Sequence, residues 1–229
     1  AREERYNFFR NIAKKTKSNW IMTGHHGNDQ LETVLINLAR QTGVSGLLGI
    51  AKKNGMIIRP LLPFSKIELV DFAKRIGFKY LEDSTNHDIS IPRNFLRKKI
   101  VQPWENQMPH IIKGSYHSIQ HFKEWKEALD YFILDLIIPT LNYSENMFEI
   151  PKSMVEKMPK MAVIRLIQIL IYEEKKLWSK HEIKMLDHFI NNKLKTSSHK
   201  LFKDWFLIYH KKMLIGQKVL NFSKGLVNI

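Results

Sequence analysis

The sequence contains no cysteine among its 229 residues. Disulfides, thiolate zinc sites and redox-active cysteine pairs are therefore excluded within these residues. Long apolar runs are also missing, since the two best candidates, 132–138 and 161–172, are short and carry charged side chains. Neither approaches the roughly 20 apolar residues that a membrane-spanning helix needs, and no signal peptide is visible. We therefore expect a cytoplasmic protein with no membrane partner.

Acidic residues are comparatively few, with 22 Asp and Glu against 37 Lys and Arg, which leaves a formal net charge of +15. The excess is spread along the chain, because residues 1–105 carry +8 and residues 106–229 carry +7. A distributed positive charge favours a polyanionic partner, most simply nucleic acid. The alternative is a generally basic protein from a lysine-rich proteome. A hydrophobic content of 44% indicates a folded core rather than disorder.

Short apolar runs alternate with amphipathic segments in the first half of the chain. Residues 1–17 have a helical pattern, residues 20–23 and 56–59 are predicted strands, and further helices are predicted at about 29–40 and 65–77. Ser65 and Glu68 have the spacing of a capping box at the start of the last of these helices. This alternation predicts an α/β fold with a parallel sheet covered by helices.

Residues 102–115 contain two prolines and a glycine, which are typical of breaks between elements, and we place a domain boundary after residue 105. The remainder, 106–229, is predicted to be mainly helical, with a strand at 146–150 and a β-hairpin over 200–217. Trp125, Trp178 and Trp205 are candidates for stacking on bases. A buried aromatic is the commoner case, and we predict that Trp125 lies in the core.

A polar cluster follows the first predicted strand, where residues 25–33 read His-His-Gly-Asn-Asp-Gln-Leu-Glu-Thr. In open α/β sheets, ligands bind where a strand ends and a helix begins. Asp29 and Glu32 are three residues apart and share one helix surface, and two carboxylates suit either Mg²⁺ or an ammonium group. The alternative is a capping box in which Asp29 is the N-cap and Glu32 its partner, with His25 and His26 as turn residues.

A second polar cluster spans residues 82–97, which read Glu-Asp-Ser-Thr-Asn-His-Asp-Ile-Ser-Ile-Pro-Arg-Asn-Phe-Leu-Arg. Its possible anion-binding groups end the stretch: Asp88, Arg93, Asn94 and Arg97. Arg93 and Arg97 are one helical turn apart, so both guanidinium groups can face one phosphate-bearing ligand. The alternative is a solvated loop followed by the basic start of a helix.

Together the two clusters resemble the tRNA(Ile)-lysidine synthetases, a family of PP-loop ATPases. That family carries a His-His-x-x-Asp-Gln-x-Glu-Thr stretch and, later, a Glu-Asp-x-x-Asn-x-Asp stretch followed by Arg-Asn-x-x-Arg. The likeness covers residues 1 to about 105 well and is weaker beyond. The resemblance implies a partial Rossmann-like PP-loop domain at 1–105 and a mainly helical, tRNA-binding domain at 106–229.

The resemblance also implies a reaction. ATP, with Mg²⁺, adenylates the C2 oxygen of the wobble cytidine in the CAU anticodon of tRNA(Ile), and the ε-amine of free L-lysine then displaces AMP. The catalytic residues implied are Asp29, Glu32, Arg93, Asn94 and Arg97. The residues implied to bind lysine, ATP or cytidine are His25, His26, Gln30, Asp83, Asn86 and Asp88. The metal ligands stay unassigned, and a homodimer is compatible with the resemblance.

Two departures from the family pattern bear on activity. Asn28 stands where the family usually has an acidic residue, which argues against a metal role for it. The family's Ser-Gly-Gly-x-Asp-Ser loop precedes these motifs and is not within this sequence. We therefore expect this polypeptide to be inactive alone and the intact protein to begin upstream. The alternatives are a tRNA-thiolating PP-loop enzyme, which the lack of cysteine disfavours, a non-catalytic tRNA-binding fragment, and a small-molecule amidoligase.

Overall fold

The computed structural model describes residues 2–79, 88–171, 178–191, 199–202 and 204–219. Its contacts divide the chain into two compact units, Ala1–Lys126 and Glu127–Ile229, which we call the first and the second unit. The division falls within the long helix α7 (Ile111–Tyr131). The boundary predicted after residue 105 lies inside the first unit, and it stays a prediction.

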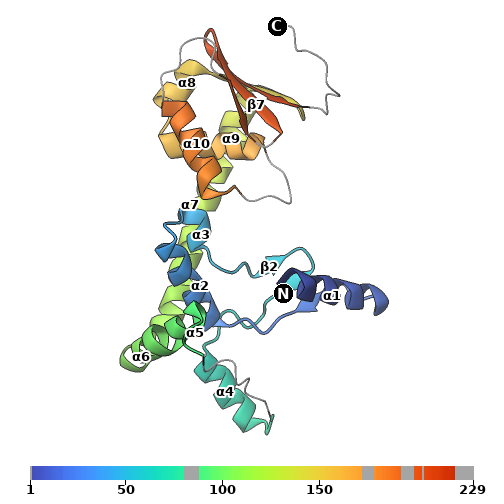
Figure 1. Ribbon diagram of the computed structural model, residues 1–229, viewed down its shortest axis with the longest axis vertical. Coiled ribbons are helices and arrows are strands. Elements are labelled where there is room, and N and C mark those ends of the chain that lie inside the picture. Colours follow the sequence, from blue (N-terminus) through green and yellow to red (C-terminus); the bar gives the residue numbers. More distant parts are fainter. Residues whose placement is uncertain (1, 80–87, 172–177, 192–198, 203, 220–229) are drawn as a thin grey trace. The chain divides into compact units, whose positions relative to one another are not determined.

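The first unit contains a small three-stranded sheet with the order β1-β3-β2 (Figure 1). Strands β1 (Ile21–Met22) and β3 (Ile57–Ile58) pair in parallel. Strand β2 (Lys53–Asn54) pairs with β3 in the antiparallel direction. Gly55, with φ +56°, makes the tight turn between them, as the Asn-Gly pair favours. The predicted α/β class is confirmed, and β2 makes the sheet mixed rather than purely parallel.

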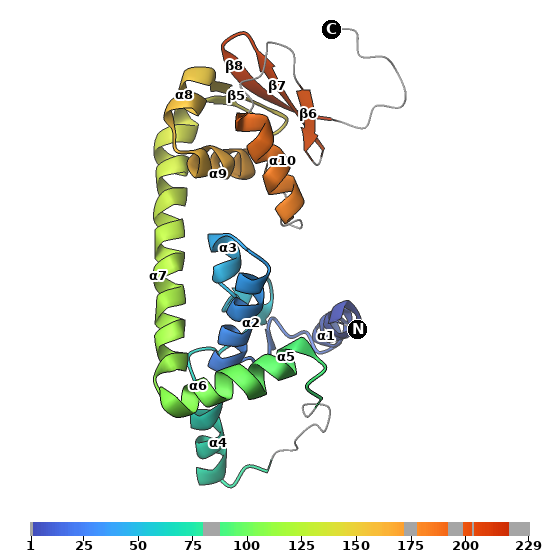
Figure 2. The same cartoon turned by 60° about the vertical axis from the view of Figure 1, so that its left-hand side comes forward.

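The helical segments of the first unit follow the predicted order. They are α1 (Arg2–Lys15), α2 (Gly27–Ala39), α3 (Val44–Leu47), α4 (Lys66–Arg75), α5 (Pro92–Phe95), the π-helical segment η2 (Leu96–Val101) and α6 (Gln102–Gln107). The capping box of α4 is confirmed, because the Ser65 hydroxyl accepts the Glu68 N–H at 3.2 Å and the Glu68 carboxylate accepts the Ser65 N–H at 2.7 Å. Segments α5, η2 and α6 run on from one another without a break (Figure 2).

The second unit combines helices with a five-stranded antiparallel sheet. After α7 come the π-helical segment η3 (Phe132–Ile137), the 3₁₀ turn η4 (Ile138–Thr140), α8 (Lys152–Lys157), α9 (Lys160–Leu170) and α10 (Lys180–Asn191). The strands are β4 (Asn142–Tyr143), β5 (Met147–Pro151), β6 (His199–Phe202), β7 (Trp205–His210) and β8 (Met213–Lys218), in the order β4-β5-β8-β7-β6. The predicted hairpin and the predicted strand at 146–150 are thus parts of one sheet.

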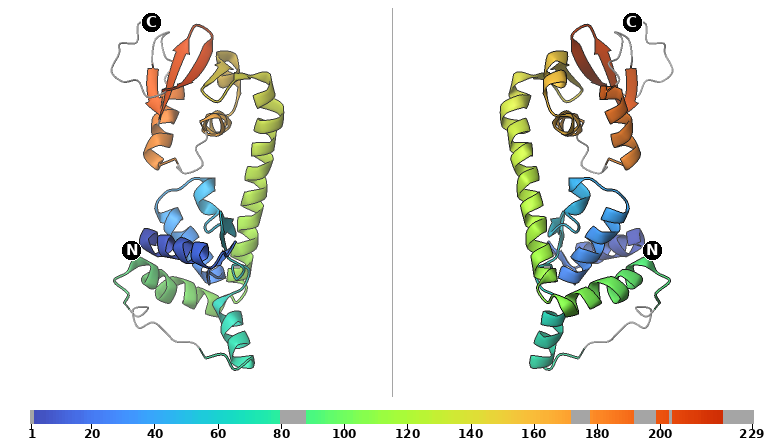
Figure 3. Two further views of the ribbon diagram at one scale, coloured as in Figure 1. Left: turned by 90° about the vertical axis from the view of Figure 1, so that its right-hand side faces the viewer. Right: turned by 90° about the vertical axis from the view of Figure 1, so that its left-hand side faces the viewer.

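One face of this five-stranded sheet is buried, and the alternation of buried and exposed residues along its strands identifies that face. Along β7, Trp205, Leu207 and Tyr209 are buried while Phe206 and His210 are exposed. The buried side chains pack with apolar residues of α9 and α10, so both helices lie against the same face (Figure 3). A strand that alternates in this way covers a core with one side only.

The prediction that Trp125 lies in the core is wrong, because this side chain is 77% exposed. The buried side of α7 is marked by Ile112 and Ile119. Trp125 comes six residues after Ile119, which at about 100° per residue places it well around the helix from that face. Trp205, in contrast, is buried and cannot stack on a base.

No helix in the described part of the chain combines the length and apolarity needed to cross a membrane.

Candidate functional site

The two polar clusters predicted from the sequence meet in the first unit. Arg93 Nε lies 2.8 Å from Glu32 Oε2, and Arg97 Nε lies 2.7 Å from Glu32 Oε1. Both arginines also reach Asp29, since their Nη2 atoms lie 3.0 Å and 3.2 Å from its Oδ1. We call these four residues the carboxylate–arginine cluster. Residues from the two polar clusters, which the family resemblance assigns to one reaction, are therefore in direct contact.

The start of helix α2 places the two carboxylates. His26 is the N-cap, and its backbone N–H donates to Asp29 Oδ2 at 3.0 Å, so Asp29 occupies the third helical position. The alternative in which Asp29 itself is the N-cap therefore has the wrong register. Gly27 is required at the first position, because a Cβ there would lie 2.5 Å from Ile112 Cγ2 and 3.0 Å from the Phe64 carbonyl oxygen.

The arginines are presented by the helical run that begins at Pro92. Arg93 and Arg97 are four residues apart and project from the same side of this run. Asn94 faces differently, since its amide donates to the carbonyl oxygen of Asp88 at 2.9 Å. The Ser90 side chain and the Ser90 N–H, the latter at 2.9 Å, both hydrogen-bond to the Asp88 carboxylate and lower the pKa of Asp88. Asp88 and Asn94 thus shape the entry to the helix and stand outside the carboxylate–arginine cluster.

Glu32 is the centre of the cluster. Its side chain is 0% exposed, and its oxygens accept three N–H bonds from the two arginines. Hydrogen bonding to Glu32 raises the pKa of Arg97, against the opposing effect of burial. A buried carboxylate is tolerated only when it is paired and hydrogen-bonded in this way. Both oxygens of Glu32 are therefore bonded within the protein, and the more exposed groups of the cluster are the two guanidinium groups.

The remaining predicted site residues have different surroundings. His25 Nδ1 lies 2.8 Å from Thr23 Oγ1. His26 Nε2 lies 3.5 Å from Asp29 Oδ2, its Nδ1 has no hydrogen-bond partner among the described residues, and burial lowers the pKa of this side chain. Asp83 and Asn86 lie outside the described residues.

Gln30 is buried, and its role in binding substrate stays a prediction. Its side chain is 2% exposed, and its amide is used at both ends by the loop after α3. The Nε2 atom donates to the Leu48 carbonyl at 3.0 Å, and the Oε1 atom accepts the Ile50 N–H at 2.5 Å. Gln30 therefore anchors this loop to α2.

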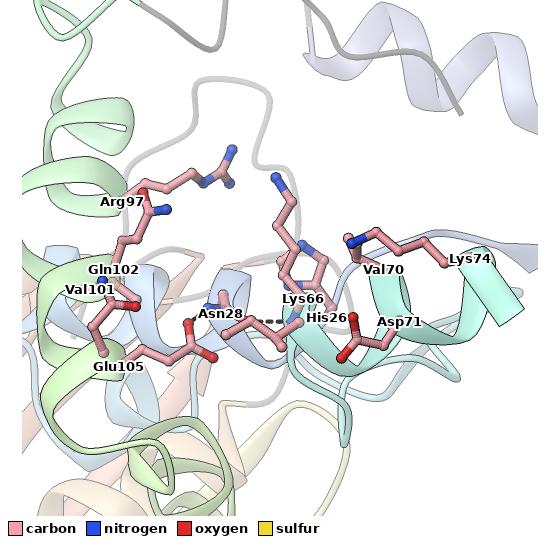
Figure 4. A pocket seen from close by; sticks show the side chains of 12 residues that line it. His26, Asn28, Lys66, Val70, Asp71, Lys74, Arg97, Val101, Gln102 and Glu105 are labelled. Atoms are coloured by element: carbon pink, nitrogen blue, oxygen red, sulfur yellow. Dashed lines mark hydrogen bonds between the residues drawn. The ribbon is translucent and has the colours of Figure 1, made fainter. Parts of the chain in front are cut away.

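A pocket beside Arg97 contains residues that the sequence motifs did not identify (Figure 4). Its volume is about 350 Å³, and its walls come from the start of α2, from α4 and from the η2–α6 run. Asn28 links the walls, because its amide donates to Glu105 Oε2 at 2.7 Å and its Oδ1 accepts the Lys66 N–H at 2.8 Å. Lys66, Lys74 and Glu105 belong to no recognisable motif, and only the folded chain brings them together.

The donors present do not form a metal site. Asp29 and Glu32 are engaged by arginines, and the residue at position 28 is an amide bonded to Glu105. Within the described ranges, no three His, Asp or Glu side chains gather at one place.

Comparison with known proteins gives consistent matches. Residues 1–104 match the model of the PP-loop domain family. The chain is 39% identical to the tRNA(Ile)-lysidine synthase of Chlorobaculum tepidum over 138 residues, which are 60% of this chain and 42% of that protein. It is 38% identical to the protein of the same name from Thermosipho africanus over 154 residues, or 66% of this chain and 35% of that protein.

A third relative, the tRNA(Ile)-lysidine synthase of Thermotoga sp. strain RQ2, is 38% identical over 130 residues, which cover 54% of this chain and 31% of the relative. The matched part thus spans less than half the length of each of these relatives. The resemblance inferred from the two polar motifs is confirmed by these matches.

Proposed function

We propose that this chain, whose residues 1–104 form a PP-loop domain, carries part of the active site of an ATP-dependent ligase that joins L-lysine to a cytidine of tRNA. The cytidine is the wobble base in the CAU anticodon of tRNA(Ile), and the bond is made at its C2. The observation that carries the proposal is the meeting of Asp29, Glu32, Arg93 and Arg97 at one place beside a pocket.

The proposed reaction has two steps. The cytidine C2 oxygen attacks the α-phosphorus of ATP and releases pyrophosphate. The ε-amine of lysine then attacks C2, and AMP leaves with the oxygen. The first step builds negative charge on phosphate, and the second needs an amine that has lost its proton. The site must therefore supply cationic groups for the phosphates and a carboxylate near the amine.

Arg93 and Arg97 are the proposed phosphate-binding groups. Their side chains are 38% and 26% exposed, so each guanidinium keeps a solvent-facing part while its Nε bonds to Glu32. A guanidinium held rigidly at one edge presents its remaining N–H groups in a fixed direction, which suits the planar recognition of phosphate. Glu32 is a positioning residue in this scheme, and Asn94 positions the same helical run through Asp88.

Asp29 is the proposed contact for the lysine ε-ammonium. Its side chain is 13% exposed and lies at the mouth of α2, next to His26. A carboxylate at that place can bind the ammonium form and receive its proton before attack. No step is assigned to Mg²⁺. The net charge of +15 supports a tRNA partner, since phosphate contacts dominate nucleic-acid affinity.

The test uses two proteins: this 229-residue chain, and a fusion in which the loop-bearing N-terminal segment of the Chlorobaculum relative precedes it. We expect the fusion to transfer radioactive lysine to tRNA(Ile) when ATP is present, and the chain alone to transfer none. Changing Arg97→Ala in the fusion should lower turnover by about 100-fold or more. Arg75→Ala, an exposed arginine on α4 that lies outside the carboxylate–arginine cluster, is the matched control and should leave turnover unchanged.

Two results contradict the proposal. ATP-dependent turnover of lysine without tRNA indicates a small-molecule amidoligase. Salt-dependent tRNA binding by the fusion without ATP–pyrophosphate exchange indicates a non-catalytic RNA-binding module.

The role of Asp29 is tested separately with Asp29→Asn in the fusion. We expect a raised KM for lysine, or no turnover, in a protein that still folds. If Asp29 only caps α2, the substitution should instead cost about 1 kcal/mol of stability and leave lysine use normal.

A further inference from the structure

The chain between α3 and β2, residues 48–52, belongs to neither a helix nor a strand, and we call it the return segment. Its backbone is bonded to the Gln30 side chain of α2, which donates to the Leu48 carbonyl at 3.0 Å and accepts the Ile50 N–H at 2.5 Å. The Gln30 side chain is buried, so losing either hydrogen bond would leave a buried polar group unsatisfied. The Gln30 amide therefore joins α2 to the return segment.

Two further side chains hold the same part of the chain. Arg59, which follows β3 and is buried, donates from Nη1 to the Ala51 carbonyl at 2.7 Å. Asn37, about two turns along α2 from Gln30, donates to the Gly46 carbonyl at 2.8 Å, and α3 lies beside α2 in Figures 1 and 2. The return segment and the helix before it are thus tied both to α2 and to the end of β3.

Gly49 lies directly on the Gln30 amide. A Cβ added at Gly49 would be 2.8 Å from Gln30 Oε1 and 3.0 Å from its Nε2, so the amide would have to move. Gly49 also has φ +61°, in the left-handed region that favours glycine. Gly55 has a similar φ of +56°, but a Cβ there would meet none of the described residues within 4 Å. A comparison of the two glycines therefore separates the contact with Gln30 from the cost of the backbone conformation.

Gln30 belongs to the first turns of α2, which present the two carboxylates of the carboxylate–arginine cluster. It follows Asp29 directly, so its side chain leaves the helix about 100° around the axis from that carboxylate. Asp29 and Glu32 face Arg93 and Arg97, while the Gln30 amide faces the return segment. Because these turns are bonded on two sides, they cannot rotate about the helix axis without breaking one set of bonds.

We propose that Gln30 is a positioning residue, which fixes the rotation of the first turns of α2 through the return segment and so keeps Asp29 and Glu32 aligned with the arginines. Gln30 does not touch substrate in this scheme, since both ends of its amide are bonded within the protein. A direct substrate contact would require the amide to give up two buried hydrogen bonds. The consequence for the reaction rests on the proposed function, whereas the link between α2 and the return segment does not.

The first experiment follows hydrogen exchange by mass spectrometry in the 229-residue chain. Gln30→Met keeps the length of the side chain and removes both hydrogen bonds. We expect it to speed exchange about tenfold or more in the return segment and in the first turns of α2, with α9 of the second unit at the parent's rates. Gly49→Ala should have the same effect from the other side of the contact, so the result does not depend on one variant.

The matched controls are Gly55→Ala, which carries a similar backbone strain without the contact, and Gln107→Met, which changes an exposed glutamine on α6. Both should leave exchange in α2 at the parent's rates. The inference is overturned if α2 keeps the parent's rates in Gln30→Met, or if Gly55→Ala speeds exchange in α2 as much as Gly49→Ala does.

The second experiment measures lysine transfer in the fusion described above. We expect Gln30→Met to lower kcat about tenfold and to leave KM for lysine and for ATP within about twofold, as a positioning role requires. In an Arg97→Ala background the further loss should be under about twofold, because the arrangement that Gln30 maintains is already disturbed. A raised KM with unchanged kcat would make Gln30 a substrate contact. An equal loss of kcat in both backgrounds would make its role merely structural, and either result overturns the inference.

The two experiments also separate this inference from the proposed function. Faster exchange in α2 for both variants, with no lysine transfer by the parent fusion, would keep the link between α2 and the return segment and reject the proposed function. Lysine transfer by the fusion, with the parent's exchange rates in α2 for both variants, would reject the link and keep the proposed function.

Discussion

The two units of the molecule are stabilised by different kinds of contact. In the second unit, seventeen buried apolar side chains from the sheet and its helices form one cluster. In the first unit the corresponding cluster has three, Leu31, Val101 and Ile112. All six polar side chains found buried in the described residues lie in the first unit: Asn28, Gln30, Glu32, Arg59, Asn94 and Glu105.

This difference explains which contacts hold the candidate site in place. Apolar packing is non-directional and is set mainly by area and volume. Hydrogen bonds and ion pairs fix distances and angles, but each buried partner becomes costly once the other is removed. The charged groups of the first unit are therefore held in a defined arrangement, and this unit is expected to tolerate substitution less well. The second unit is expected to tolerate exchange of polar residues and to be sensitive to changes in apolar volume.

The largest expected effect is that of Glu32→Gln. It removes the fully buried carboxylate to which both arginines donate and leaves them only their contact with Asp29, which should lower the free energy of unfolding by about 3–5 kcal/mol. Hydrogen exchange read by mass spectrometry should show the loss in α2 and in the α5–α6 run, with α9 and β7 unchanged. A loss under about 1 kcal/mol would contradict the structural role given to Glu32.

The second prediction concerns Leu207→Ala in β7. Leu207 is 0% exposed in the large apolar cluster, and truncation of such a side chain should cost about 2–5 kcal/mol. The same exchange experiment should place this loss in the second unit alone. Equal loss of protection in α2 would show that the two units unfold as one, and would end the distinction between them.

A smaller effect is expected at two matching helix caps, one in each unit. Ser179 and Glu182 form the capping box of α10, with hydrogen bonds of 2.6 Å and 3.2 Å, as Ser65 and Glu68 do for α4. Ser65→Ala and Ser179→Ala should each cost about 1 kcal/mol in urea unfolding, and Thr at either position should restore most of it. Unequal losses would mean that the surroundings of the helix matter more than its cap.

The smallest effect is a pH dependence at Glu105. Its pKa is raised in the folded chain by burial and by the charge of Glu68, against the effect of the Asn28 hydrogen bond. A carboxyl group with a raised folded-state pKa favours folding while it is protonated, and that contribution is lost as pH rises through the folded-state pKa. Glu105→Gln should therefore gain stability relative to the parent as pH rises from the ordinary range of a glutamate through the raised folded-state pKa of Glu105. If the stability difference between the variant and the parent stays constant or falls as pH rises, the pKa of Glu105 is not raised in the folded chain.

Several features of the fold were predictable because their causes are local in the chain. The capping boxes involve residues three apart, the Asn54-Gly55 turn involves neighbours, and the apolar face of α2 repeats every three or four residues. The five-stranded sheet was only partly predicted, because the pairing of β5 with β8 joins residues more than sixty apart. Trp125 was misjudged for a related reason: which side of a helix is covered depends on what packs against it.

What the sequence determined by itself was a part of the helices and strands, the family resemblance carried by two motifs, and the residue types that a charged site requires. Only the tertiary structure decided how those residues are used. It surrounds Glu32 with two arginines from a segment more than sixty positions away, and it places Asp29 against the same two arginines. It also brings Glu105 and Lys66 to one pocket through Asn28. Burial and long-range hydrogen bonds assign these roles, and neither is encoded in the spacing of neighbouring residues.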